Sequence, residues 1–175
     1  GTPVLCGVVG VDPKGKILRE LMGGLDLSTN AIVEDSARAT TSKTRIISSS
    51  HHLLRVDEED VGVIDDQLQE VLFYKIQEEV EQGVDVIIFE DYDKGVITPE
   101  IIEETISSCK QRGIPTVVDP KKRNFLRYEG CSLFKPNLKE LKEGLKIELP
   151  NNSIEDVKFA VRQLRKVMNV EASLI

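Results

Sequence analysis

Cysteine and histidine are scarce in this sequence, and their positions argue against a zinc site. The 175 residues contain three cysteines and two histidines, without a C-x-x-C pair. His51 and His52 are adjacent and offer little to complete a thiolate cluster. Cys6, Cys109 and Cys131 are odd in number and widely spaced, unlike a disulfide framework. We expect free thiols in a reducing compartment, with Cys6 and Cys131 buried because both lie in apolar patterns.

Long apolar runs and an excess of positive charge are also missing. No stretch reaches the roughly 20 apolar residues that a membrane-spanning helix needs. The first residues lack the basic segment of a signal peptide. With a net charge of −7, the chain is unsuited to bind nucleic acid or an anionic membrane surface. We therefore expect a cytoplasmic protein with neither nucleic-acid nor membrane partners, in which any phosphate site is local.

The familiar nucleotide-binding motifs are absent as well. Neither a P-loop nor a protein-kinase signature occurs. Gly7 and Gly10 do not begin a dinucleotide fingerprint, because the third glycine and a helix at the right offset are missing. The sequence has no internal repeat and no low-complexity tract. A site must therefore be inferred from the way in which secondary structure would arrange the polar residues.

From residue 65 onward, helical and strand patterns alternate with short loops between them. Apolar runs predict strands at residues 84–89, 115–118, 131–134 and 171–175. The first of these is expected to be buried on both faces. Helices are predicted in between, with Thr98 and Ser153 as capping residues at two of their starts. This alternation predicts an α/β fold with a parallel sheet and right-handed crossovers.

The first part of the chain has a different pattern. Residues 4–9 predict an interior strand, followed by a helix that Asp12 caps and that ends in a left-handed cap at the Gly-Gly pair beginning with Gly23. β-Branched runs without a steady apolar face come next. We expect a small β flap around residues 31–57, outside the main sheet, with two of its strands joined through residues 48–52.

Charged and amide side chains follow three of the predicted strands, at the point where each strand ends. The pairs are Asp91 and Lys94, Asp119 and Lys121, and Asn137 and Glu140. Because parallel strands end at one edge of a sheet, we expect these groups to meet in one crevice. Oxygen ligands without a His or Cys cluster favour Mg²⁺ over zinc, and lysines beside them suit a polyphosphate. The structural alternative is that these are the polar residues of ordinary solvated loops.

The segment from Phe134 to Glu140 carries both a structural and a functional signal. A short apolar strand stops at Pro136, which cannot continue a ladder. Asn137 and Glu140 have the spacing of a capping box, which is a sufficient structural reason for both. The same two residues would also lie at the carboxyl end of a strand and at the start of a helix, where phosphate and metal are attracted.

The sequence begins and ends inside expected strands. Residues 4–9 have almost nothing before them, and residues 171–175 look like a strand that has only started. We therefore expect residues 1–175 to be an internal fragment of a single domain, with both ends of that domain missing.

Six motifs occur in an order that characterises one family. They are Gly7-Val8-Val9-Gly10-Val11-Asp12, Thr40-Thr41-Ser42-Lys43-Thr44-Arg45, Leu54-Arg55-Val56-Asp57, Asp91-Tyr92-Asp93-Lys94-Gly95-Val96, Val118-Asp119-Pro120-Lys121 and Lys135-Pro136-Asn137-Leu138-Lys139-Glu140. With these motifs, essentially the whole chain resembles the kinase domain of the bacterial ADP-heptose synthesis enzymes, which are ribokinase-like (PfkB) sugar kinases. Asn137 to Glu140 matches the N-x-x-E element of ribokinase-like kinases in general, whereas D-Y-x-K-G and T-T-x-K-T-R point to the heptose branch.

The resemblance implies a ribokinase-like fold, with a mostly parallel sheet flanked by helices and a small β flap. It also implies that the parent protein uses ATP and Mg²⁺ to phosphorylate C1 of D-glycero-β-D-manno-heptose 7-phosphate, a step toward the heptose of lipopolysaccharide. A homodimer with a phosphosugar substrate is expected. The alternatives are a kinase for another phosphosugar, such as a fructose phosphate, and a non-catalytic remnant that binds only a nucleotide or a partner.

The resemblance further implies roles for individual residues. The nucleotide is expected to bind at the helix start and after the preceding strand, to Asn137, Leu138, Lys139, Glu140 and Lys121. The metal is expected at two carboxylates, Glu140 and Asp119. The sugar is expected near Asp91 and Lys94, and its 7-phosphate on the flap at Lys43 and Arg45. The structural alternatives are helix capping, a strand-ending turn and simple solvent exposure.

Two features depart from the family pattern. His51 and His52 stand where relatives usually carry glutamines, which affects the polar contacts of the flap. The family's N-terminal sugar-binding segment of glycine and asparagine, and its C-terminal G-A-G-D segment with the catalytic base, have no counterpart here. We therefore assign no catalytic residue and expect the fragment itself to lack kinase activity.

Overall fold

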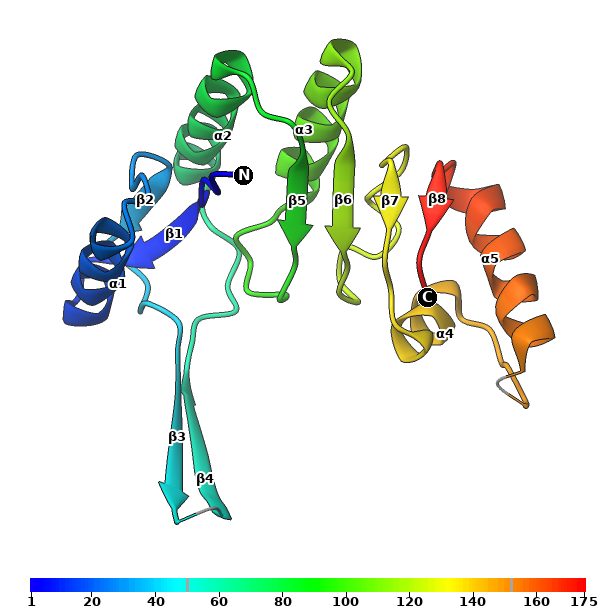
Figure 1. The fold of residues 1–175 in the computed structure, drawn as a ribbon, viewed down its shortest axis with the longest axis horizontal. Helices are drawn as coiled ribbons and strands as arrows, with labels where there is room; N and C mark the ends of the chain where they lie inside the picture. The colour runs from blue at the N-terminus through cyan, green and yellow to red at the C-terminus, as the bar shows by residue number, and fades with distance from the viewer. Residues whose placement is uncertain (50, 152) are drawn as a thin grey trace. The chain divides into compact units, whose positions relative to one another are not determined.

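A parallel sheet organises the second half of the chain. The computed structural model describes residues 1–49, 51–151 and 153–175. Four strands are hydrogen-bonded in chain order: β5 (Ile87–Glu90), β6 (Thr116–Asp119), β7 (Leu133–Phe134) and β8 (Ala172–Ser173). All of their pairings are parallel (Figure 1). The predicted sheet is confirmed, although β5, β7 and β8 are shorter than the runs that predicted them and β6 is shifted by one residue.

The register of this sheet aligns the ends of its strands. Phe89 of β5 is paired with Val118 of β6, and Val118 with Phe134 of β7. Because the strands are parallel, the segments that follow these three residues leave the sheet at the same edge. We call it the carboxyl edge. The prediction that the three polar loops share one edge is confirmed.

Helices cover one face of the sheet. Three helices contribute to a single buried cluster with the strands: α3 (Pro99–Arg112), α4 (Leu138–Leu145) and α5 (Ile154–Met168). Phe125 and Tyr128 add aromatic rings to this core, and Phe125 meets Phe134 edge-on with ring centroids 5.1 Å apart. Gly144 of α4 lies against the Phe125 ring so closely that a Cβ atom there would overlap it.

The opposite face of the sheet is exposed, which corrects the expectation that residues 84–89 are buried on both faces. Side chains alternate along a strand, so Ile88 points away from the face of Phe89 and is 57% exposed. Val86, two residues before Ile88 and on the same face, is also exposed. An apolar run identifies a strand, but it does not say whether one or both faces will be covered.

Several helices begin and end where their capping residues predict. The Thr98 side chain accepts a hydrogen bond from the Ile101 N–H at 3.3 Å, and Pro99 is the first residue of α3. The helix ends at Gly113, whose φ of 68° is left-handed. Ser153 forms a capping box at the start of α5. Each cap satisfies backbone groups that the helix end would leave unpaired.

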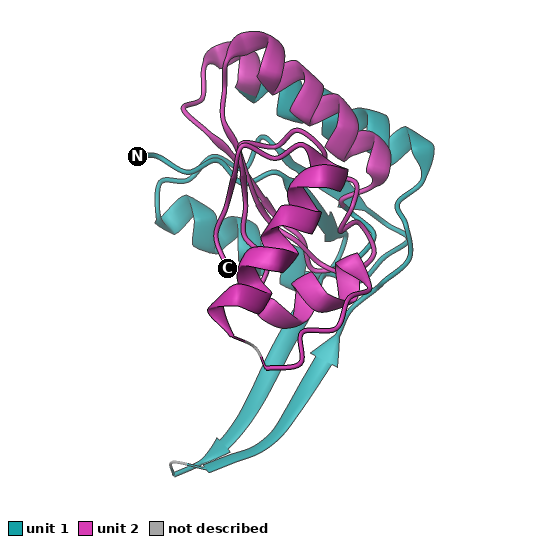
Figure 2. Ribbon diagram, turned by 90° about the vertical axis from the view of Figure 1, so that its right-hand side faces the viewer, with its two compact units in different colours: residues 1–79, 94–96 teal, residues 80–93, 97–175 magenta. Residues whose placement is uncertain are grey.

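The first part of the chain forms a small parallel pair. β1 (Gly7–Gly10) pairs with β2 (Ile32–Asp35), and α1 (Pro13–Gly24) connects them. Their apolar side chains form a separate core of Val9, Met22 and Ile32. α2 (Asp66–Gln82) follows later in the chain. None of the described helices is long and apolar enough to cross a membrane. The chain divides into two compact units, residues 1–79 with 94–96 and residues 80–93 with 97–175 (Figure 2).

Three expectations for the first part of the chain are wrong. Pairing with β2 starts at Gly7, so the predicted strand does not extend back to residue 4, and Cys6 is exposed. Cys109 and Cys131 are buried free thiols. Asp12 caps α1 as predicted, but the helix runs through both glycines, and the left-handed position falls on Asp26 with φ 55°. Aspartate is one of the residues that tolerate this conformation.

The predicted flap is a β-hairpin. β3 (Ser42–Ser48) and β4 (His51–Glu58) pair antiparallel and form a sheet of their own, so the prediction of strands outside the main sheet is confirmed (Figure 1). Its predicted start near residue 31 is wrong, because β2 pairs with β1 instead. Ser50, in the predicted connection, lies outside the described residues.

Candidate active site

An ion pair links neighbouring strands at the carboxyl edge. Lys135, directly after β7, places its Nζ 3.3 Å from Oδ2 of Asp119, the last residue of β6. The backbone fixes both residues: the Lys135 N–H donates to Val118 O at 2.8 Å, and the Asp91 N–H donates to Asp119 O at 3.2 Å. Asp119 is therefore held at the sheet edge, as predicted. Lys135 was not among the predicted site residues, although its position directly after a strand is the same signal.

The start of α4 contains the predicted capping box. Asn137 Oδ1 accepts from the Glu140 N–H at 2.9 Å, and Glu140 Oε2 accepts from the Asn137 N–H at 2.9 Å. The Glu140 side chain is only 13% exposed. The cap uses one oxygen of Glu140 and leaves Oε1 for another partner.

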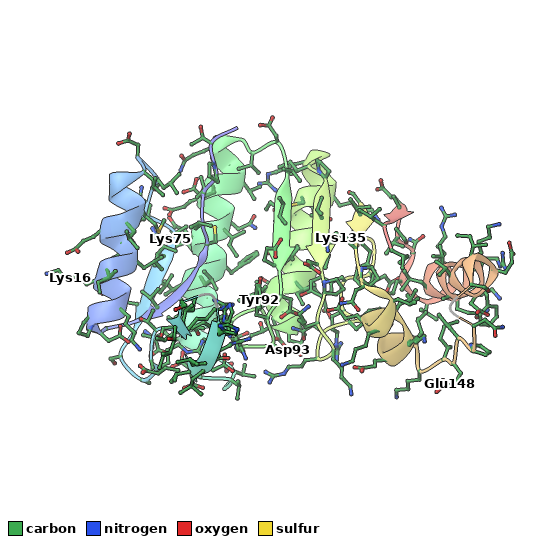
Figure 3. The ribbon with its side chains drawn as sticks, turned by 60° about the horizontal axis from the view of Figure 1, so that its bottom comes forward. Lys16, Lys75, Tyr92, Asp93, Lys135 and Glu148 are labelled. Carbon is green, nitrogen blue, oxygen red and sulfur yellow. The ribbon has the colours of Figure 1, made fainter. Side chains whose placement is uncertain are left out.

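That partner is Lys121. Lys121 lies in the loop that follows β6, and its Nζ donates to Glu140 Oε1. This hydrogen bond is the main reason why the pKa of the Lys121 ammonium is raised, and Asp119 and Tyr92 are close enough to raise it further. Figure 3, which brings the carboxyl edge forward, labels Tyr92 and Lys135 on the loops after β5 and β7. Three loops of one unit therefore converge on Lys121.

Two other residues predicted at the nucleotide site present their side chains elsewhere. Leu138 packs against the hydrophobic core. Lys139 is exposed, with its Nζ 3.9 Å from Glu143 Oε1. At the first turn of α4, these residues offer their backbone N–H groups, which have no intrahelical partner, rather than their side chains.

Asp91 is more buried than the sequence predicts for a sugar ligand. Asp91 is only 3% exposed. Oδ2 accepts from the Tyr128 hydroxyl at 2.7 Å and from Asn124 Nδ2 at 3.2 Å, and Oδ1 accepts from the Asp93 N–H at 2.8 Å. Burial, followed by the effect of Asp91, raises the pKa of Tyr128. The carboxylate thus anchors the loop after β5, and no sequence pattern identified its two side-chain partners.

Lys94 belongs to the other unit, at the base of the hairpin. Its Nζ lies 2.6 Å from Glu59 Oε1. Gly95 has a φ of 72°, and a Cβ there would overlap the carbonyl of Gly62. Arg38, a half-buried cation that sequence reasoning missed, donates to the carbonyls of Gly62 and Lys94 at 2.8 and 3.2 Å. Lys94 is therefore held in a fixed turn.

The two flap cations differ in their partners. Lys43 Nζ lies 3.4 Å from Asp57 Oδ2 and 3.3 Å from Glu59 Oε2. Arg45 is paired in register with Arg55, which is itself held by Asp57 at 2.6 Å. Within the described part of the chain, Arg45 is exposed and has no acidic partner. Of the two flap cations, Arg45 therefore has the charge that is more available to a ligand.

The donor set of the carboxyl edge fits magnesium better than zinc. In the described ranges, no group of three or more His, Cys, Asp and Glu side chains could hold a metal by itself. Asp119 and Glu140 supply two carboxylates at the edge. Mg²⁺ in nucleotide sites typically uses one or two carboxylates together with phosphates and water.

Comparison with known proteins identifies the family. The model of the "pfkB family carbohydrate kinase" matches residues 1–172. The chain belongs to the pfkB family of carbohydrate kinases. Among its relatives, the "Bifunctional protein HldE" of Caulobacter vibrioides is 39% identical over 173 residues, covering 98% of this chain and 35% of that protein. The HldE of Caulobacter sp. strain K31 is 41% identical over 144 residues, covering 82% and 29%.

Two solved kinase structures have the same fold. A phosphofructokinase-2 mutant from Escherichia coli superposes with a TM-score of 0.71 at 20% identity, covering 99% of this chain and 56% of that one. Ribokinase from Giardia lamblia gives 0.66 at 17% identity, covering 97% and 52%. The predicted ribokinase-like fold is confirmed. The chain spans about a third of the length of its HldE relatives and about half of these structures.

Proposed function

We propose that this chain is part of a kinase domain that transfers the γ-phosphoryl group of ATP to C1 of D-glycero-β-D-manno-heptose 7-phosphate, on the way to the ADP-heptose of lipopolysaccharide. Similarity to HldE proteins over nearly the whole chain supports this substrate. The observation that carries the proposal is the convergence of Asp119, Lys121 and Glu140 at the carboxyl edge, beside the start of a helix.

The proposed nucleotide site is the first turn of α4. The N–H groups of Leu138 and Lys139 donate to phosphate oxygens, as helix starts commonly do. Lys121 contributes a positive charge to the same phosphates. Glu140 and Asp119 would hold Mg²⁺, while Asn137 keeps the Glu140 carboxylate in place. When bound, the metal neutralises negative charge on the ATP phosphates during transfer of the γ-phosphoryl group.

The sugar contacts are proposed within the other compact unit, on the hairpin and the turn at its base. Arg45, which has no ion-pair partner among the described residues, binds the 7-phosphate, and Lys43 lies two residues away on the same face. Lys94 contacts the sugar. Asp91, because it is buried and hydrogen-bonded, acts by holding the loop that leads to Lys94 rather than by touching the substrate.

The proposal extends to the parts of the enzyme that this chain does not supply. Transfer to a hydroxyl needs a base close to that oxygen, and we place the base outside these 175 residues. The chain is then inactive by itself, and the complete protein is a cytoplasmic homodimer. The fact that the chain spans about a third of its HldE relatives supports this division.

The test uses a protein in which this chain continues into a complete pfkB domain. It is incubated with ATP, Mg²⁺ and the heptose 7-phosphate, and ³¹P NMR follows the appearance of an anomeric phosphate. Faster transfer to fructose 6-phosphate would assign the chain to another phosphosugar kinase. Nucleotide binding without transfer to any sugar phosphate would indicate a non-catalytic protein. Comparable turnover by the 175-residue chain alone would show that the base has been misplaced.

A further inference from the structure

Both oxygens of Glu140 already have protein donors. Oε2 accepts from the Asn137 N–H at 2.9 Å, and Oε1 accepts from Lys121. The first bond belongs to the helix cap and ties the carboxylate to the backbone. The second is made by a flexible side chain that is 36% exposed. Of the two donors, only Lys121 can leave without disturbing the start of α4.

The second carboxylate of the site is paired in the same way. Asp119 Oδ2 lies 3.3 Å from Lys135 Nζ, and Asp119 is also close enough to act on Lys121. Each of the two oxygen ligands proposed for the metal is therefore faced by a lysine. A divalent cation that approaches either carboxylate must compete with an ammonium group for the same oxygen.

Nucleotide phosphates change this competition. They bring negative charge to the first turn of α4, which contains Glu140, and next to the Lys121 ammonium. We propose that Lys121 is an exchangeable counter-ion, which occupies Glu140 until a metal–nucleotide complex arrives and then moves from the carboxylate to a phosphate. This inference rests on the proposed nucleotide site. Its consequence is that metal and nucleotide bind better together than either does alone.

A purely structural ion pair would predict something different. Partly exposed ion pairs contribute little to folding stability. If Lys121 served only to stabilise the fold, its loss would leave the metal affinity of the chain unchanged. An exchangeable counter-ion instead makes opposite contributions to two binding reactions. It weakens the binding of metal alone, because it competes for Glu140, and it strengthens the binding of nucleotide, because it meets a phosphate.

The first experiment measures Mn²⁺ binding to the 175-residue chain by electron paramagnetic resonance, without nucleotide. Lys121→Met should bind Mn²⁺ about tenfold more tightly than the unmodified chain, as expected when one competing charge is removed from a partly exposed site. Lys121→Arg keeps the charge and should remain near the unmodified chain. Lys122→Met is the matched control, because Lys122 is the next residue, is 75% exposed and lies 3.9 Å from Glu143.

A double variant links the effect to its partner. Glu140→Gln combined with Lys121→Met should lose the gain in Mn²⁺ affinity, while circular dichroism and the melting temperature confirm that each variant is folded. Unchanged or weaker Mn²⁺ binding by folded Lys121→Met would overturn the proposal, and so would a gain that persists in the double variant.

The second experiment measures Mg²⁺–ADP binding to the complete kinase by calorimetry. Lys121→Met should weaken it about tenfold, and Lys122→Met should not. Equal affinity of Lys121→Met and the unmodified kinase would overturn the transfer of Lys121 to phosphate. Failure of the proposed function is distinguishable: the complete kinase would then not phosphorylate the heptose phosphate, whereas the change in Mn²⁺ affinity would still be observed.

Discussion

The carboxyl edge of the β5–β8 sheet and the β3–β4 hairpin present their charges on very different supports. At the sheet edge, Asp119 directly follows the fully buried Val118, and Glu140 is held by a helix cap. On the hairpin, every residue of β4 is exposed, and Lys43 and Arg55 are held mainly by carboxylates. The comparison teaches that the residues of the proposed nucleotide site are tied to the folded core, whereas the residues proposed to contact the sugar phosphate lie on an exposed hairpin and can vary without affecting that core.

The largest expected effect is a loss of folding stability when the core beneath the carboxyl edge is disrupted. Phe134→Ala removes a fully buried ring between Val118 and Phe125 and should lower the free energy of unfolding by about 3–5 kcal/mol. Urea denaturation of the chain measures this. Ile46→Ala on the exposed hairpin is the control, with an expected change within about 0.5 kcal/mol. Similar losses for both variants would remove the distinction between the two regions.

The next effect separates charge from structure at the sheet edge. Glu140→Gln keeps an oxygen that can accept from the Asn137 N–H, so the cap and the melting temperature should be preserved. In the complete kinase it should lower kcat/KM for ATP by about 10²-fold, comparable to the loss of one electrostatic contact at a reacting phosphate. A large fall in melting temperature with little kinetic change would reassign Glu140 to capping alone.

On the hairpin, the expected effect is on substrate affinity and not on folding. Arg45→Ala should raise KM for the 7-phosphorylated sugar by the equivalent of about 1.5–3 kcal/mol, with little change in KM for ATP. Arg55→Ala is the matched control, since Arg55 faces Arg45 in register but is already bound by Asp57. Equal losses for the sugar and for ATP would contradict the assignment.

The smallest effect concerns the joint between the hairpin and α1. The Thr40 N–H, and then the Gly15 N–H, lower the pKa of Asp12 from 3.8 to about 2. Below pH 3.8 the Asp12 carboxylate is protonated in the unfolded chain but stays ionised in the folded chain. The stabilisation from these hydrogen bonds is therefore fully present above pH 3.8 and is lost as the pH falls toward 2. Hydrogen exchange should therefore show the hairpin base loosening in acid, and Asp12→Asn should remove that part of the pH dependence. An unchanged pH profile in Asp12→Asn would exclude this role.

Features that depend on residues close together in the sequence could be predicted, whereas features that depend on distant residues could not. Thr98, Asn137 and Ser153 cap their helices as predicted because a cap involves residues only three positions apart. The burial of Asp91 could not be predicted, because Tyr128 and Asn124 reach it from 37 and 33 residues away. Ile88 was misjudged for a similar reason, since its exposure depends on which face the helices cover.

Gly144 has a consequence for the timing of site formation. Glycine weakens a helix interior by about 1 kcal/mol relative to alanine, and a helix of eight residues is too short to persist alone in water. α4 therefore forms only when it can lie against Phe125, which the missing side chain permits. Asn137 and Glu140 acquire their positions in the same step in which the aromatic core closes. Nucleotide affinity should consequently appear during refolding together with burial of Phe125, and not before it.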